Sequence, residues 1–136
     1  MYRCLFSMAS ESVVIDQQTN QVSVINVLED IQSPGFPLVI SKLSAVFYLT
    51  REASDNAIVE FSIRFFNNEI ELNRFPVTSN FEDKLKNRTR IQVNGLVIPN
   101  PGNFSVGIFY NDEELSRWQM AIQLLPNAQF QVQIPG

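Results

Sequence analysis

Residues 58–72 read Ile-Val-Glu-Phe-Ser-Ile-Arg-Phe-Phe-Asn-Asn-Glu-Ile-Glu-Leu, and this stretch decides the fold class. Large apolar residues recur at every second position of its first half, namely Val59, Phe61, Ile63 and Phe65. Because side chains alternate between the two faces of a strand, this spacing predicts a β-strand with one apolar face. Asn67 and Asn68 tolerate positive φ, and the alternation resumes after them, so the stretch is expected to form a hairpin.

The same alternation recurs along the rest of the chain, interrupted by turn residues about every ten positions. The further expected strands are Arg3–Ser10, Val13–Ile15, Val22–Leu28, Ser41–Thr50, Arg88–Asn94, Phe104–Tyr110, Trp118–Leu124 and Phe130–Ile134. One short helical turn is expected at Ser79–Leu85, where Asn80 can cap it. Strands with one polar face are typical of stacked antiparallel sheets. The sequence therefore predicts an all-β fold, an antiparallel two-sheet β-sandwich of about eight strands.

Length and composition exclude some classes of function and make others less favoured. The 136 residues are a common size for one domain, so we expect residues 1–136 to form a single domain. The net charge is −4 and the pI is about 4.7, which makes a nucleic-acid partner unlikely. The chain has no histidine and one cysteine, Cys4. These counts exclude an internal disulfide and disfavour transition-metal sites and histidine acid–base chemistry. We therefore expect no catalytic residue, no metal and no cofactor.

The N-terminal residues and the overall hydropathy pattern bear on localisation. The first apolar run is too short and too interrupted for a signal peptide, and no stretch approaches the roughly 20 apolar residues of a membrane span. We expect a cytoplasmic protein without membrane contact.

Two stretches resemble a family of short bacterial proteins of unknown function. They are residues 23–37, Ser-Val-Ile-Asn-Val-Leu-Glu-Asp-Ile-Gln-Ser-Pro-Gly-Phe-Pro, and residues 98–106, Ile-Pro-Asn-Pro-Gly-Asn-Phe-Ser-Val. In the second, Pro101 fixes the approach to a late strand, Gly102 permits the bend and Phe104 enters the core. This pattern also resembles immunoglobulin-like and C2-like sandwiches. The resemblance implies a sandwich and implies no reaction, because fold alone does not supply an activity.

Candidate catalytic groups have ordinary structural explanations. Cys4 lies in an alternating strand without a histidine partner, as expected of a buried apolar residue. Glu69 and Glu71 share a strand face and could act as a carboxylate pair, but their place beside a turn favours solvent exposure. The acidic groups Glu29-Asp30, Glu52/Asp55 and Asp112–Glu114 lack the spacing of a calcium loop.

The most distinctive charged feature is Lys84, Lys86, Arg88 and Arg90, which we call the basic strip. If the strand begins by Lys84, all four side chains project from one face over roughly 20 Å, at about 3.3 Å per residue. Such a strip suits an acidic partner, a phosphate or a nucleic-acid backbone. The alternative is that these cations protect an exposed edge strand or pair with acids on neighbouring strands.

Phe36, in Pro34-Gly35-Phe36-Pro37, is the second candidate binding residue. It can anchor a partner or close the end of the sandwich. The sequence thus indicates a non-enzymatic binding or assembly module that acts through protein–protein contacts, with a protein partner or a second copy of itself. The alternative is an anionic-ligand or nucleic-acid binder along Lys84–Arg90.

Overall fold

The structure is a computed structural model that describes residues 1–126. In that part of the chain it contains nine strands and no helix. They are β1 (Arg3–Ile15), β2 (Val22–Val27), β3 (Asp30–Ser33), β4 (Leu38–Thr50), β5 (Ile58–Asn67), β6 (Ile70–Asn80), β7 (Lys86–Ile98), β8 (Gly102–Tyr110) and β9 (Glu113–Leu124).

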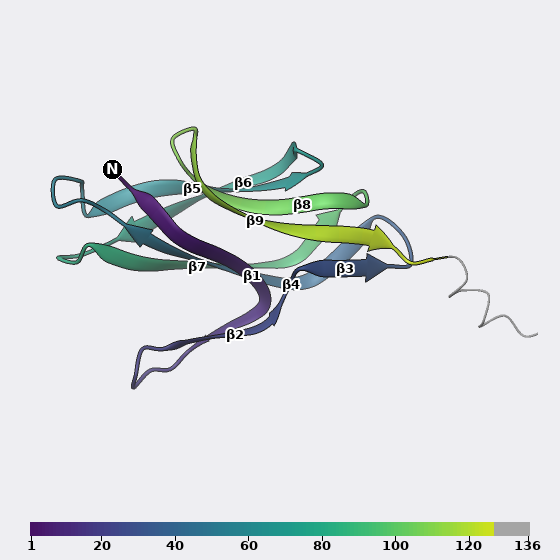
Figure 1. Ribbon diagram of the computed structural model, residues 1–136, viewed down its shortest axis with the longest axis horizontal. Helices are drawn as coiled ribbons and strands as arrows, with labels where there is room; N and C mark the ends of the chain where they lie inside the picture. The colour runs from purple at the N-terminus through teal and green to yellow at the C-terminus, as the bar shows by residue number, and fades with distance from the viewer. Residues whose placement is uncertain (127–136) are drawn as a thin grey trace, which may run out of the picture.

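The strands form two sheets that face each other, as Figure 1 shows. Sheet A has the order β2-β1-β4-β7, and sheet B has the order β3-β9-β8-β5-β6. The predicted two-sheet β-sandwich is confirmed, with nine described strands instead of about eight. One pairing departs from the antiparallel expectation, because β3 runs parallel to β9 with Asp30 opposite Ala121.

The core lies between the sheets and consists of the alternating residues that the sequence indicates. On β4 the inward side chains are Leu43, Ala45, Phe47 and Leu49; on β5 they are Val59, Phe61, Ile63 and Phe65; on β8 they are Phe104, Val106 and Ile108. Tyr2 and Phe81 close one end of this core, where their rings stack 6.2 Å apart. Burial of these large apolar surfaces is the main source of stability.

The β5–β6 hairpin turns one residue later than Asn67-Asn68. Asn67 still pairs with Ile70, and the two turn residues are Asn68 and Glu69, with φ of 51° and 66°. A two-residue turn with positive φ at both positions matches the right-handed twist of the flanking strands. Asn68 suits this conformation, whereas the positive φ of Glu69 could not be read from its residue type.

β1 changes partners midway. Residues 3–10 pair with β4, and residues 10–15 pair with β2, in a hairpin that lies on the outer side of sheet A (Figure 1). Val46 faces this outer side between Ala45 and Phe47, yet it is fully buried. The hairpin therefore forms part of a third layer over one region of sheet A. The sequence analysis predicted two separate strands, Arg3–Ser10 and Val13–Ile15, and did not predict this layer.

Two expectations in the β6–β7 region are wrong. Ser79–Leu85 is not helical, because Ser79 and Asn80 complete β6 and only a turn follows at residues 82–83. β7 begins at Lys86, so Lys84 lies in the preceding loop and not on the strand. The expected strand Phe130–Ile134 lies outside the described residues. Within residues 1–126, no helix is long and apolar enough to cross a membrane.

Candidate functional site

The basic strip lies at the edge of sheet A. Within the described chain β7 pairs with β4 alone, so its other backbone edge has no strand partner. Thr89, Ile91 and Val93 face inward, and Lys86, Arg88 and Arg90 therefore project from the outer face of sheet A. The structure thus brings three of the four predicted residues together on one strand face, with Lys84 in the adjoining loop.

Two arginines of the basic strip hold the β1–β2 hairpin. Arg88 donates from Nη2 to Asn20 Oδ1 at 2.9 Å and from Nη1 to the Asn20 carbonyl oxygen at 3.3 Å. Arg90 Nη1 donates to the Val13 carbonyl oxygen at 3.3 Å. Arg88 also lies 6.0 Å above the Tyr48 ring. These arginines therefore have a structural role that sequence spacing could not reveal, because their partners are about 70 positions away.

No residue of the basic strip forms an ion pair with a carboxylate of the described chain. By contrast, each arginine on the outer face of sheet B has one: Arg64 with Asp112, Arg74 with Glu71, and Arg117 with both Glu69 and Glu114. Lys84, Lys86 and Arg88 surround a depression of about 450 Å³ with Asn20, Tyr48 and Asn87. The molecule is acidic overall, so this is a local surface of uncompensated positive charge.

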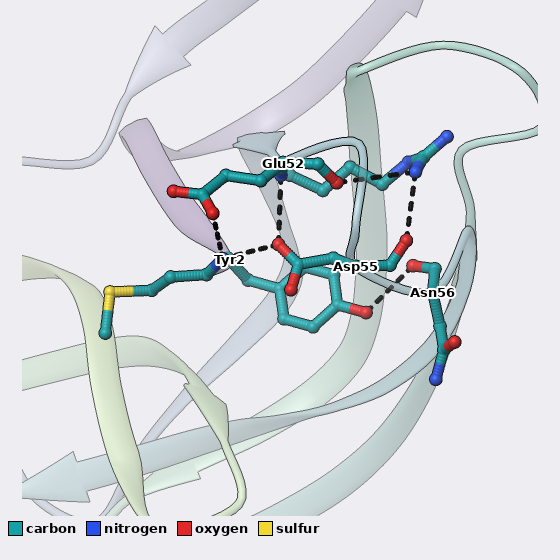
Figure 2. A network of polar contacts seen from close by, with 6 residues as sticks. Tyr2, Glu52, Asp55 and Asn56 are labelled. Atoms are coloured by element: carbon teal, nitrogen blue, oxygen red, sulfur yellow. Dashed lines mark hydrogen bonds and ion pairs between the residues drawn. The ribbon is translucent and has the colours of Figure 1, made fainter.

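A polar network positions the loop that carries Lys84, as Figure 2 shows in part. The guanidinium of Arg51 donates to four carbonyl oxygens: Nε to Lys84 at 3.0 Å, Nη1 to Asp55 at 3.0 Å and to Glu52 at 3.5 Å, and Nη2 to Glu82 at 3.4 Å. The Asp55 carboxylate in turn accepts hydrogen bonds from the Met1 ammonium and from the Glu52 backbone N–H, as drawn in Figure 2. The network therefore joins the 51–56 loop to the loop before β7.

Replacing Asp55 with asparagine is expected to flatten the acid limb of the stability profile. The Met1 ammonium, and secondarily the Glu52 N–H, hold the pKa of Asp55 below its ordinary value. The stability from this shift is present above the ordinary aspartate pKa of about 4 and is lost as the pH falls through the depressed value. Melting temperatures of wild type and Asp55→Asn should differ at pH 6 and converge towards pH 2.

Asp83→Asn is the matched control, because the Asp83 carboxylate makes no hydrogen bond or ion pair with the described residues. Its melting temperature should follow the wild type across the same range. A wild-type-to-Asp55→Asn difference that stays constant from pH 6 to pH 2 contradicts the prediction.

An apolar groove separates the inner sides of β6 and β7. At one end these strands meet, where the Ser79 and Thr89 hydroxyls lie 3.2 Å apart. Further along they diverge around a groove of about 600 Å³ that we call the β6–β7 groove. Its lining residues are Phe75, Pro76, Val77, Ile91, Gln92, Val93 and Asn94. Ile91 and Val93 point towards the core but stay half-buried, and the Phe75 ring is 40% exposed. Sequence alternation correctly placed Ile91 and Val93 on the inner face of their strand but could not show that the sheets separate here.

The outer face of sheet B carries a stacked cluster that sequence reasoning missed. Arg64 lies 4.2 Å above the Phe109 ring, Phe109 lies 5.9 Å from Phe66, and Arg117 lies 4.1 Å above Phe66. Gly107 sits opposite both arginines in the strand register and leaves room for the Phe109 ring. Both guanidiniums already contact carboxylates and aromatic rings, so we interpret this cluster as having a structural role.

The other candidate groups occupy separate places. Burial raises the pKa of the Cys4 thiol, and its Sγ–H donates to the Phe6 carbonyl oxygen. Glu69 pairs with Arg117 and Glu71 with Arg74, so they do not form a carboxylate pair. Residues 1–126 contain no group of three or more side chains suited to hold a metal. Phe36 is half-buried against the core in the β3–β4 loop, the geometry expected of a residue that closes the sandwich.

Comparison with known proteins gives a family without an assigned activity. A family model described as a family of unknown function (DUF6941) matches residues 5–123, which confirms the resemblance noted in residues 23–37 and 98–106. No curated protein matches the sequence. An immunoglobulin-like protein from Pseudomonas aeruginosa is similar over 90% of this chain and 96% of that chain, at 10% identity and a TM-score of 0.47. Similarity at this level carries no argument, and the strand pairing alone establishes the sandwich.

Proposed function

The chain belongs to this family of unknown function, and from that premise we propose that it is a non-enzymatic binding module. Its partner adds an extended peptide segment to the edge of β7 that has no strand partner in the described chain. The main support is that three features occur together along β7. Its outer backbone edge has no strand partner among the described residues, the β6–β7 groove lies beside it, and its cations have no carboxylate partner in the described chain. The partner is a protein segment with alternating apolar side chains, flanked by acidic residues.

The backbone of β7 supplies the first part of this recognition. An edge strand presents a row of free N–H and C=O groups that pair with an added strand, while side-chain pockets select alternate residues. The half-buried Ile91 and Val93 on β7 face Phe75 and Val77 across the β6–β7 groove. A peptide with apolar residues at every second position would bury these four side chains further.

The charge distribution supplies the second part. Arg90 directly precedes the groove residues of β7 in sequence. Lys86 and Lys84 lie further towards the N-terminus, beyond the end of the groove where β6 and β7 meet. Lys84 and Lys86 are exposed and their side chains make no hydrogen bond with the described residues. Acidic residues beside the paired segment would meet these cations, which gives electrostatic complementarity and a salt-dependent association rate.

Titration with an end-blocked octapeptide of alternating valine and glutamate, followed by amide NMR shifts, tests the proposal. The peptide should shift the amides of residues 90–94. Val93→Asp should abolish these shifts, because it places a charge in the β6–β7 groove. Val97→Asp is the matched control, since Val97 lies on the same strand but is exposed outside the groove. No shifts in residues 90–94, or equal binding by Val93→Asp, overturns the proposal.

The cations are tested in the same titration. Lys84→Glu and Lys86→Glu should each weaken peptide binding about fivefold, equivalent to about 1 kcal/mol. Lys42→Glu, an exposed lysine outside the basic strip, should leave binding unchanged.

The second candidate is an anionic ligand or nucleic acid held along Lys84, Lys86, Arg88 and Arg90, favoured by the depression of about 450 Å³ among three of these cations. A single-stranded oligonucleotide is the probe that separates the two. Oligonucleotide binding that weakens steeply with salt and is unaffected by Val93→Asp, with no response to the peptide, replaces the proposed function with this candidate.

A further inference from the structure

Sheet A has a second edge, formed by β2. Among the described residues β2 pairs with β1 alone, from Val22 opposite Ile15 to Val27 opposite Ser10, and it forms the outer strand of the β1–β2 hairpin (Figure 1). Its other side has no strand partner in that part of the chain, as is also true of β7 at the opposite end of the strand order. Two such edges on different copies of the chain can pair with each other.

β2 carries the kind of side chains that the proposed peptide partner of β7 requires. Ile25 and Val27 occupy alternate positions of the strand, and their side chains are 45% and 37% exposed. The half-buried Ile91 and Val93 line the β6–β7 groove. Pairing β2 with β7 of another copy would cover apolar surface on both strands, and burial of apolar surface favours association.

The charges at the ends of the two strands are complementary and select a direction. Glu29 and Asp30 directly follow β2, are exposed, and form no ion pair with the described residues. Antiparallel pairing brings this end of β2 towards the start of β7, where Lys84 and Lys86 also have no ion pair in the described chain. Parallel pairing would place the two acids at the far end of β7, away from these lysines, so charge favours the antiparallel arrangement.

We propose that the segment bound at β7 is β2 of a second copy of this chain, an inference that rests on the proposed function and names its partner. β2 of one copy pairs antiparallel with β7 of the next. The exposed apolar side chains of β2 enter the β6–β7 groove, and the two acids after β2 face the lysines at the start of β7. Each copy uses one edge and still offers the other, so the contact is heterologous and builds a ring or an open chain of copies.

Sedimentation of the full chain at low ionic strength tests this assembly. The wild-type mass should rise with concentration beyond that of a dimer. Val93→Asp disables β7, and Ile25→Asp/Val27→Asp disables β2, because each places charge in the apolar contact. Each variant alone should remain at the monomer mass of 15.5 kDa. An equimolar mixture of the two should form a dimer and nothing larger, because one variant keeps an intact β2 and the other an intact β7.

Ile58→Asp/Ile70→Asp is the matched control for the two disabled edges. It adds the same charge at residues of sheet B that are 64% and 68% exposed and do not line the β6–β7 groove. Its mass should rise with concentration like that of the wild type. If the control is monomeric as well, added negative charge alone prevents association, and the proposed pairing of edges is overturned.

Charge reversal tests the direction of pairing with substitutions at exposed side chains. Glu29→Lys and Lys86→Glu should each raise the concentration needed for association about fivefold, because each brings like charges together. Combined in one chain, they restore opposite charges across the contact and should return association to within about twofold of the wild type. A double variant that associates no better than either single variant contradicts the antiparallel arrangement.

The octapeptide titration distinguishes failure of this inference from failure of the proposed function. Ile25→Asp/Val27→Asp keeps β7 intact, so the peptide should still shift the amides of residues 90–94. If that variant binds the peptide but the wild type stays monomeric up to about 1 mM, self-assembly is overturned and peptide binding at β7 stands. Absence of both association and peptide shifts overturns both proposals.

Two further results overturn self-assembly through β2 and β7. The first is association that persists in both single-edge variants, because the copies then meet at another surface. The second is a wild type that associates while the mixture of Val93→Asp and Ile25→Asp/Val27→Asp stays monomeric, because identical edges then pair with each other.

Discussion

Phe104→Ala is expected to lower the free energy of unfolding by about 3–5 kcal/mol, since it removes a large buried ring and leaves a cavity. Phe104 is fully buried on β8, and its ring centroid lies 6.0 Å from that of Phe65 on β5. Neighbouring residues can close the cavity only partly, because β8 is paired on both sides. Urea denaturation monitored by Trp118 fluorescence measures the loss.

Phe75→Ala is the matched control, because it is the same substitution at a ring that is 40% exposed. Its loss should be less than half that of Phe104→Ala, since less apolar area leaves water on folding and solvent can fill the vacated space. Equal losses would show that the region around Phe104 relaxes like a surface site, contrary to its place between two paired strands.

Gly102→Ala is expected to cost about 2–4 kcal/mol, from about 1–3 kcal/mol of backbone strain and about 1 kcal/mol for a disturbed hydrogen bond. Gly102 has φ of +131°, a conformation that alanine rarely adopts. A Cβ there would lie 2.0 Å from Asn68 Oδ1, which accepts a hydrogen bond from the Asn103 N–H. The mutation therefore affects the turn of β5–β6 as well as the start of β8.

Gly35→Ala is the control, because an added Cβ has no neighbour within 4 Å there, and its effect should stay within about 0.5 kcal/mol. Asn68→Gly in the Gly102→Ala background separates the two causes. It removes the steric conflict but keeps the strained backbone, so it should restore part of the stability. Full restoration would show that the backbone at Gly102 carries no strain, and no restoration would show that Asn68 is not involved.

The inward faces of β4, β5 and β8 were predictable because each of these strands has one apolar side. Leu43, Phe47, Phe61 and Phe104 all lie where period-two alternation places them. Pro101-Gly102-Asn103-Phe104 also acts as expected, since Gly102 adopts a positive φ and Phe104 enters the core. These features depend on residue type and local spacing, which a single sequence contains.

The remaining features depend on how distant segments meet. The sequence shows the period of β1 but not that its second half leaves β4, because Arg88 and Arg90 stabilise that arrangement from the far edge of the sheet. The four residues of β3, Asp-Ile-Gln-Ser, do not reveal a parallel partner about 90 positions later. Likewise, the inward side of Val93 was predictable, whereas the groove beside it depends on the divergence of β6 from β7.

The parallel pairing of β3 with β9 has a consequence for the order of folding. The hairpins β1–β2, β5–β6 and β8–β9 join neighbours in sequence, but β3 is made long before its only described partner. The hydrogen bond from Trp118 to Leu28 likewise spans 90 positions. Such non-local contacts form only after a large loop closes, and sandwiches dominated by them fold in milliseconds to seconds. During synthesis, β3 must therefore wait for β9 to leave the ribosome, and burial of the single tryptophan reports when the sandwich closes.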